Sequence, residues 1–504
     1  MNANIALNPN QVVAFLKKEP AAFTRDDIIR FVTENGIRMV NFMYPAEDGR
    51  VKTLNFVINN LAYLEAILSQ GERVDGSSLF PSFVEPGSSD LYVVPRYKTA
   101  FLDPFAEIPT LSMLCSFFDK DGEPFKCDPR QTLVKAEEEF TLATGMRFEA
   151  MGELEYYVID DSEPLFPATD QRGYHESEPF AKLNDFRIKC MDYIARTGGQ
   201  VKYGHSEVGN FTLDGKVYEQ NEVEFLPNPA ESAADQLILA KWVIRNLAWQ
   251  YGFNVSFAPK ITTGKAGSGM HIHMRLMRDG VNVTLGSDGR LSQESRRAIA
   301  GMMLLAPSIT AFGNRNPTSY FRLVPHQEAP TNVCWGDCNR SVLVRVPLGW
   351  SSGKDMCAAA NPLQKPVVAT ANSKQTFEMR SPDCSADIYQ LMASLCVAAR
   401  YGLEMPAEEA LAIAERTYVD LDIHKPENAS RLASLDSLPV CCSDSAVCLE
   451  QKRDVYEAKG VFQPKMIDGI VRSLKSFEDN DLHKRADADP ELMKSLVEKY
   501  FYCG

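Results

Sequence analysis

This sequence lacks the usual signatures of nucleotide, zinc and membrane binding. No G-x-x-x-x-G-K-[ST] loop is present, so a nucleotide would have to be held in another way. Seven histidines and no C-x-x-C pair exclude a zinc-finger layout. The longest apolar stretches, residues 301–312 and 391–403, are too short or too interrupted by polar residues to span a membrane. The first thirty residues include Lys17, Lys18, Arg25, Asp26 and Asp27 and hold no apolar signal core, so we expect no secretory signal.

Positive charge is also in short supply. The chain has 53 Lys and Arg against 67 Asp and Glu, a net charge of −14. A net negative charge disfavours a binder of the phosphate backbone, because such proteins usually show a basic face, and we expect no nucleic-acid partner. Its 45% hydrophobic and 24% charged residues exclude a disordered chain or a coiled-coil rod. The twelve cysteines are irregularly spaced in a chain long enough to build a core without disulfides, which predicts reduced thiols in a cytoplasm.

The first part of the chain reads as a helix followed by a small strand-rich unit. Residues 10–18 have helical spacing, whereas residues 37–43 and 51–58 alternate like paired strands. Residues 71–89 are rich in Gly, Ser and Pro, so we expect a loop there. Asp128 then opens a helix that runs to about residue 144. We therefore place a domain boundary near residue 125, after which strands alternate with long helices at 232–251 and 292–305.

Carboxylates gather on two predicted strands in the second part. Period-two geometry puts Glu153 and Glu155 on one face of the first strand, and Glu222 and Glu224 on one face of the second. Glu207 lies shortly upstream of the second strand. Carboxylates side by side repel one another unless a cation lies between them. A single acidic strand is typical of a solvated face, but two of them favour a cation site.

A Gly-Ser-Gly turn feeds a third strand that carries histidines. One face of this strand holds His271, His273 and Arg275, and its methionines and isoleucine would face the core. Two imidazoles on one face favour a role as ligands over a role in the core. Residues 376–380 place Glu378 and Arg380 together in the same way. Further guanidiniums in between suggest an anionic substrate, namely those of Arg322, Arg340 and Arg345.

These carboxylates, imidazoles and guanidiniums indicate which metal and which reaction the site would support. Many carboxylate oxygens, few imidazoles and no thiolate favour Mg²⁺ or Mn²⁺ over Zn²⁺ or copper. Divalent cations beside arginines are what phosphoryl transfer requires, because the charge on the transferred group must be neutralised.

The order of these motifs resembles that of the type I glutamine synthetases over nearly the full length. The matching pieces are residues 74–78 (VDGSS), 153–155 (ELE), 207–208 (EV), 220–223 (QNEV), 267–271 (GSGMH), 322–325 (RLVP), 328–330 (EAP), 339–341 (NRS) and 377–380 (FEMR). The resemblance implies an α+β fold. Its parts would be a small N-terminal β-grasp-like domain, residues 1–125, and a large catalytic domain with an antiparallel sheet and flanking helices, residues 126–504.

The resemblance also implies roles for single residues. One Mg²⁺ or Mn²⁺ would be held by Glu155, Glu207 and Glu222, and a second, near the phosphates of ATP, by Glu153, His271 and Glu378. Arg322 and Arg380 would bind the carboxylate of glutamate, with Gly267 near its amino group. Arg340 and Arg345 would neutralise the phosphoryl group. His273 and Lys374 would contact the nucleotide, although Lys374 is equally well read as a surface lysine.

The implied reaction is the ligation of ammonia to glutamate through γ-glutamyl phosphate, with ATP as phosphoryl donor. Asp75 would deprotonate ammonium, with Ser78, Tyr174 and Glu207 beside it, and Glu328 would close the site against water. Because Asp75 belongs to the small domain, it would act in a neighbouring subunit's site. The chain would then form an obligate homo-oligomer, usually two stacked hexameric rings.

Some positions depart from the family pattern. His326 and Gln327 precede Glu328, Ala266 precedes the Gly-Ser-Gly turn, and extra residues lie between Arg345 and Glu378, around 346–366. Related enzymes join glutamate to polyamines or other amines and alter only the ammonium pocket. A γ-glutamyl-amine ligase, or a non-catalytic scaffold of the same fold, therefore stays open beside glutamine synthesis.

Overall fold

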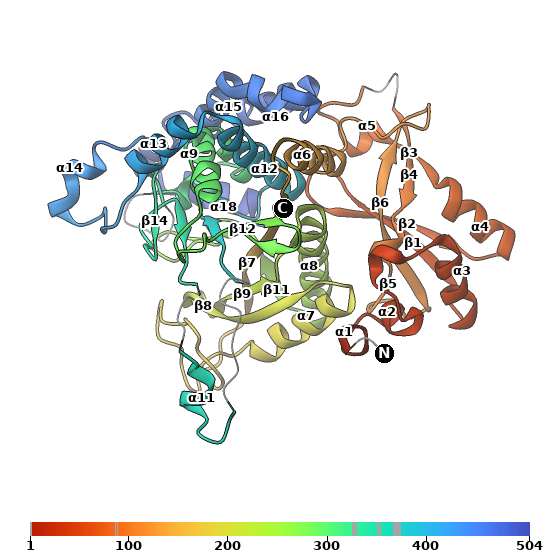
Figure 1. The fold of residues 1–504 in the computed structure, drawn as a ribbon. Coiled ribbons are helices and arrows are strands. Elements are labelled where there is room, and N and C mark those ends of the chain that lie inside the picture. The colour runs from red at the N-terminus through yellow and green to blue at the C-terminus, as the bar shows by residue number, and fades with distance from the viewer. Residues whose placement is uncertain (1–2, 86, 88, 325–329, 350–353, 366–373) are drawn as a thin grey trace.

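The computed structural model describes residues 3–85, 87, 89–324, 330–349, 354–365 and 374–504. These residues form two sheets, each with its own hydrophobic core, and the smaller sheet lies to one side of the larger body (Figure 1). The small core is built from residues between Val12 and Phe117, and the large core from residues between Leu133 and Leu474. The boundary near residue 125 stays a prediction.

The small sheet has the strand order β2-β1-β6-β4-β3, with β5 paired to β6. β1 and β2 form the predicted antiparallel hairpin, and β6 runs parallel to β1. Its strands are β1 (Met39–Pro45), β2 (Val51–Val57), β3 (Glu72–Asp75), β4 (Asp90–Pro95), β5 (Phe101–Leu102) and β6 (Thr110–Phe118). The helices of this part are α1 (Ala3–Ala6), α2 (Gln11–Leu16), α3 (Arg25–Glu34), α4 (Leu61–Gln70) and α5 (Gly76–Leu79).

The structure corrects the prediction that residues 71–89 form a loop. It contains β3 and the short helix α5, because β3 pairs antiparallel with β4, which follows it in the chain. The approach is close at Gly71, where a Cβ atom would lie 2.2 Å from the carbonyl oxygen of Val93. Pairing with another strand thus outweighs the local preference of Gly, Ser and Pro for turns.

The large sheet has the strand order β14-β15-β16-β12-β7-β9-β8. It is antiparallel apart from β14 and β15, which run parallel. Its strands are β7 (Arg147–Asp161), β8 (Val201–Leu213), β9 (Lys216–Phe225), β12 (Met270–Arg278), β14 (Trp335–Asp337), β15 (Val344–Val346) and β16 (Phe377–Met379). Short strands at its margins are β10 (Asn228–Pro229), β11 (Asn254–Ser256) and β13 (Val281–Asn282).

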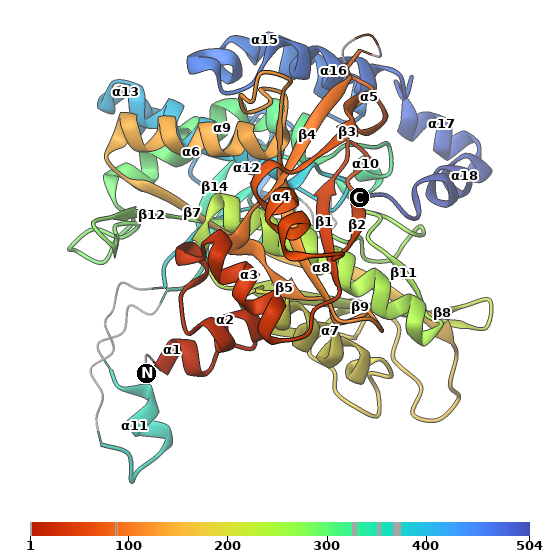
Figure 2. The ribbon, with the colours of Figure 1, turned by 90° about the vertical axis from the view of Figure 1, so that its right-hand side faces the viewer.

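Helices cover one face of this sheet and bury its apolar side chains. α8 packs directly against β7, and α12 packs against α6 and α9 (Figures 1 and 2). The main helices are α6 (Pro129–Thr144), α7 (Asn184–Arg196), α8 (Ala230–Tyr251), α9 (Gln293–Gly313), α12 (Ile388–Glu404), α13 (Ala407–Thr417), α15 (Cys442–Glu457) and α16 (Pro464–Lys475). Shorter or peripheral ones are α10 (Ser319–Arg322), α11 (Met356–Ala360), α14 (Ala429–Leu432), α17 (Leu482–Ala488) and α18 (Pro490–Tyr500).

Local chemistry explains where several of these helices begin and how they pack. Asp128 caps α6, whose first residue is a proline, as the sequence predicts. α9 runs to Gly313 through an internal proline, beyond the end expected at residue 305. α9 crosses α12 at two glycines: a Cβ atom at Gly301 would lie 2.0 Å from the oxygen of Ala398. No helix among the described residues is long and apolar enough to cross a bilayer.

A buried charge network joins the two parts of the chain. Glu231, in the first turn of α8, forms ion pairs with two residues of the small part. Its Oε1 lies 2.6 Å from Arg96 Nη2 and its Oε2 lies 2.5 Å from Lys98 Nζ. On its other side Arg130 of α6 lies 3.0 Å from Glu231 and 2.7 Å from Asp235. The side chain of Arg130 is 2% exposed, so its charge depends on these partners.

Candidate active site

The face of the large sheet opposite α8 brings the predicted carboxylates together. The register sets Glu153 of β7 opposite Glu224 of β9, and Glu155 opposite Glu222. Leu154, between the two glutamates of β7, is fully buried on the other face. Directly opposed like charges destabilise a sheet unless something positive compensates them.

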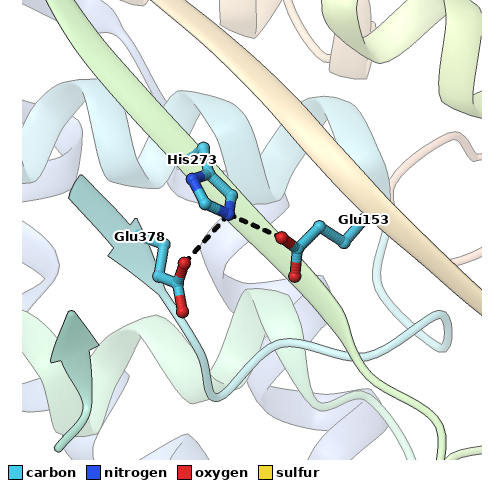
Figure 3. A group of neighbouring side chains, drawn as sticks. All are labelled: Glu153, His273 and Glu378. Carbon is cyan, nitrogen blue, oxygen red and sulfur yellow. Dashed lines mark hydrogen bonds and ion pairs between the residues drawn. The ribbon is translucent and has the colours of Figure 1, made fainter. Parts of the chain in front are cut away.

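An imidazole compensates the first group of carboxylates. His273 Nε2 lies 2.8 Å from Glu153 Oε1 and 3.0 Å from Glu378 Oε2 (Figure 3). His273 Nδ1 lies 2.9 Å from the hydroxyl of Thr376, which orients the ring. His271, the residue expected beside these two glutamates, places Nδ1 2.8 Å from Glu153 Oε2. Both histidines of β12 therefore contact Glu153, and His273, expected at the nucleotide, also joins Glu378.

Burial and charge shift the pKa values of this group. Burial would raise the pKa of Glu153, but the charge of His273 and the hydrogen bonds from both histidines lower it well below its usual range. Burial would lower the pKa of His273, but Glu153 and Glu378 raise it to about 10. The imidazolium thus occupies the position of a cation between the two carboxylates.

A second group lies one strand further along the same face. His205 Nε2 is 3.3 Å from Glu222 Oε1, and its Nδ1 is 3.8 Å from Glu207 Oε1. Donor atoms of His205, Glu222 and Glu224 lie within 4.8 Å of one another. Burial and the surrounding carboxylates raise the pKa of Glu222 well above its usual value. Glu222 therefore lacks a compensating charge of its own.

Glu155 is held at the edge of this second group. Its Oε2 accepts the amide N–H of Gly269 at 2.8 Å and the side-chain N–H of Gln220 at 3.0 Å. Gln220 also donates to the carbonyl oxygen of Gly267 at 2.9 Å, so it ties β9 to the Gly-Ser-Gly turn.

The donor chemistry of the two groups fits hard divalent cations. Carboxylate oxygens with one imidazole per group, in a buried setting of like charges, suit Mg²⁺ or Mn²⁺. One group offers Glu153, His273 and Glu378, and the other offers His205, Glu222 and Glu224. The expected ligands Glu155, Glu207 and His271 line the same face beside them.

Two of the predicted arginines converge on Glu378. Arg380 Nε lies 3.2 Å from Glu378 Oε1, and Arg345 Nη1 lies 3.5 Å from the same oxygen. Arg322 donates to the carbonyl oxygen of Ser381 at 2.8 Å, and its Nη2 lies 3.4 Å from His271 Nε2. Guanidiniums and carboxylates thus alternate, as an anionic substrate beside metal ions requires.

A cavity of about 900 Å³ opens beside these arginines. Arg340 and Arg380 line it, together with Lys265, His424 and Cys338. Cys338 is exposed and is one of twelve free cysteines. The turn next to the cavity tolerates no side chain at Gly267, where a Cβ atom would lie 2.6 Å from the oxygen of Pro259.

The residues expected to handle ammonia are split between two places. Tyr174 lies at the second carboxylate group, with its ring 5.5 Å from that of His205. Asp75 lies at the end of β3 in the small part, away from β7 and β12 (Figure 1). Asp75 accepts the Ser78 hydroxyl at 2.6 Å, and hydrogen bonds from Ser78 and Ser77 lower its pKa to about 2. Asp75 is therefore an exposed carboxylate that does not meet the site within its own chain.

The sequence also predicts roles for Lys374, at the nucleotide, and Glu328, at the closing of the site. Lys374 is exposed just before β16. Glu328, the expected closing residue, lies outside the described residues, as do His326 and Gln327. Parts of the insertion around 346–366 are also outside them, and its helix α11 projects from the body (Figures 1 and 2).

Reasoning from the sequence did not assign roles to His175, His205 or Gln220. His205 and Gln220 share the two-residue alternation of their strands with Glu207 and Glu222, so strand periodicity could have found them. His175 lies on a loop and gave no comparable signal.

Known proteins are similar to this chain in sequence and in fold. The family model for "Glutamine synthetase, catalytic domain" matches residues 126–489, and that for "Glutamine synthetase, beta-Grasp domain" matches residues 36–120. The glutamine synthetase of Mycobacterium bovis is 29% identical over 486 residues, which cover 88% of this chain and 93% of the relative. That of Thermotoga maritima is 28% identical over 469 residues, 90% of this chain and 96% of the relative.

Two solved structures show the same fold. The structure described as apo GmaS without ligand has a TM-score of 0.70 and 18% identity, covering 90% of this chain and 96% of that one. A novel glutamine synthase homolog has a TM-score of 0.68 and 21% identity, covering 89% and 98%.

Proposed function

Because the chain belongs to the glutamine synthetase family, we propose that it ligates ammonia to the γ-carboxylate of L-glutamate, with ATP as phosphoryl donor and γ-glutamyl phosphate as intermediate. The observation that carries this proposal is the face of the large sheet where two carboxylate–imidazole groups lie beside convergent arginines. That combination suits the transfer of a phosphoryl group to a carboxylate.

Divalent cations would be held at the two carboxylate groups. We propose Glu155, Glu207 and Glu222 for one cation, with His205 close by, and Glu153, His271 and Glu378 for the other, with His273 close by. Bound Mg²⁺ or Mn²⁺ would supply charge neutralisation at the phosphates. Metal binding would displace the proton that His273 carries between Glu153 and Glu378.

The arginines would bind and orient the anionic substrates. Arg322 and Arg380 would hold the α-carboxylate of glutamate beside the Gly267 turn, where the lack of a side chain lets the turn pack closely against Pro259 and Arg322. Arg340 and Arg345 would stabilise charge on the phosphoryl group in flight. Lys374 remains a proposed nucleotide contact, and Glu328 a proposed closing residue that keeps water from the acyl phosphate.

Ammonia must lose a proton before it attacks, and Asp75 is the proposed acceptor. Its low pKa keeps it ionised at neutral pH, so that its negative charge can attract ammonium. Because Asp75 lies away from the carboxylate face of its own chain, we propose that it acts in a neighbouring subunit, in a homo-oligomer of two stacked hexameric rings. We also propose a cytoplasmic location, which the twelve free cysteines support.

The test measures phosphate release from ATP with Mg²⁺ and glutamate, with ammonium and a panel of amines supplied in turn. We expect ammonium-dependent turnover that Asp75→Ala abolishes. Asp90→Ala is the matched control, because Asp90 is an exposed carboxylate opposite Asp75 in the same sheet. Turnover with a larger amine alone would replace ammonia by that amine. Absence of phosphate release with every amine would favour a non-catalytic scaffold.

Mixing two inactive variants tests the shared site. Asp75→Ala lacks the proton acceptor, whereas Glu378→Gln lacks a metal carboxylate. If sites form between subunits, mixed oligomers contain some sites with both residues intact, and activity returns on refolding or co-expression. No recovery in mixed oligomers would place Asp75 outside the neighbour's site.

A further inference from the structure

The loop between β7 and α7 pairs with β8 next to the second carboxylate group. β8 loses its register with β9 between Ser206 and Asn210, which is a bulge that contains Glu207. The backbone N–H groups of residues 171, 173 and 175 donate to the carbonyl oxygens of Asn210, Val208 and Ser206, at 2.8, 3.3 and 2.9 Å. The loop therefore gives β8 the backbone hydrogen bonds that β9 does not provide at the bulge.

Two backbone features fix the loop in this position. A Cβ atom at Gly173 would lie 2.4 Å from the carbonyl oxygen of Glu207, so the loop reaches the bulge only because residue 173 is glycine. His175 has φ +58°, in the left-handed region that a non-glycine residue adopts at a cost. The conformation directs the His175 ring onto that of His205.

Three rings then close against one another. The centroids of Tyr174 and His175 lie 4.2 Å apart, those of His175 and His205 4.3 Å, and those of Tyr174 and His205 5.5 Å. These spacings are van der Waals contact between rings, so no alkyl group fits between them. The side chain of His205 is only 12% exposed, whereas Tyr174 is 50% exposed, so the cluster leads from the surface to Glu222 and Glu207.

We propose that His175 and His205, packed with Tyr174, form the wall that sets the size of the amine at this site. The inference rests on the proposed function, because Tyr174 and Glu207, which we expect beside ammonium, both lie at His205. His205 lies 3.3 Å from Glu222, and His175 packs on its outer side. Ammonia fits beside such a wall, and an amine with an alkyl substituent meets the rings. His175 acts as a specificity-determining residue without touching the reacting atoms.

The experiment compares kcat/KM for ammonium, methylamine and ethylamine in the wild type and in His175→Asn. Asparagine removes the ring and tolerates the left-handed backbone. We expect the ratio of kcat/KM for methylamine to that for ammonium to rise about tenfold or more in the variant, because one rejected methyl group is worth about that much. His175→Gly, which accepts the same φ, provides a second variant should the first fold poorly.

The control keeps the same loop and changes a ring that does not reach the carboxylates. Phe180 packs against Phe166, with ring centroids 5.7 Å apart, so Phe180→Ala should leave the amine ratio unchanged. An unchanged ratio in both His175 variants, with ammonium turnover present, would overturn the wall and leave the proposed function intact. A wild type that uses an alkylamine better than ammonium would also overturn the wall. Absence of turnover with every amine would overturn the proposed function, and this inference with it.

Discussion

His273 reaches diagonally across the sheet to Glu153: their side chains meet at 2.8 Å, although the register sets His271 opposite Glu153. In the other direction His273 lies directly opposite Glu378 of β16. One imidazole therefore joins β7 to β16 across β12. In the absence of metal, it carries the positive charge that keeps two buried carboxylates together.

Replacing this imidazole should destabilise the metal-free protein. In His273→Asn, Glu153 and Glu378 lose the cation between them, although His271 still contacts Glu153, and Arg345 and Arg380 still lie beside Glu378. We therefore expect a loss of about 1–3 kcal/mol in the free energy of unfolding. Mg²⁺ should restore part of the loss, because a cation replaces the imidazolium. Urea unfolding with and without Mg²⁺ measures both effects. His483→Asn, which changes a histidine whose ring packs against Phe321, is the control. Equal stability of His273→Asn and the wild type without metal would contradict this account.

The network around Arg130 predicts a large effect far from the site. Arg130→Met leaves Asp235 buried without its cation and removes one of the three cations around Glu231. We expect a loss of about 3–5 kcal/mol. Lys120→Met, which breaks an exposed pair with Asp121, should have little effect on stability. Denaturant unfolding of the two variants side by side provides the comparison. Similar losses would show that burial of the pair has no special importance.

A half-buried carboxyl of α6, which contacts the first residues of α8, predicts a pH dependence of stability. Burial raises the pKa of Glu137 from 4.5 to about 7, although the amides of Ala230 and Glu231 donate to it. The unfolded chain releases this proton near pH 4.5 and the folded chain only near pH 7. The contribution of Glu137 is therefore fully present below pH 4.5 and is lost as the pH rises through 7.

Glu137→Gln isolates this effect because glutamine stays neutral. Relative to the variant, the wild type should lose free energy of unfolding across the window from pH 4.5 to about 7. Unfolding curves collected at both ends of the window measure the difference. A stability difference that does not change with pH would show that Glu137 titrates normally.

The crossing of α9 and α12 leaves no room for a methyl group. A Cβ atom at Gly301 would lie 2.0 Å from the oxygen of Ala398, and one at Gly402 would lie 2.0 Å from the oxygen of Arg297. Gly301→Ala should lower the free energy of unfolding by about 1–3 kcal/mol, because the helices must separate. Thermal unfolding checks this result. Gly286→Ala, where the nearest atom would be the flexible carboxylate of Asp288 at 3.1 Å, should have little effect.

Strand periodicity predicted the carboxylate face well because a strand alternates whatever its neighbours are. Glu153 and Glu155 face one way and Leu154 the other, as the sequence indicates. The diagonal contact of His273 could not be predicted, because it depends on side-chain conformations across two strand pairs. The pairing of β3 with β4 was missed because local composition favoured a loop. His175 was missed because its contact with His205 depends on how a loop folds back on a bulge.

Exposed thiols are rare in this molecule: Cys338 and Cys357 are its two exposed cysteines. Cys338 lies on the rim of the cavity with Arg340 and Arg380, whereas Cys357 lies on the projecting helix α11. Alkylating reagents would therefore label one thiol at the cavity and one remote from it. Protection of Cys338 by ligands, with Cys357 as an internal reference, would report occupancy by mass spectrometry without any turnover.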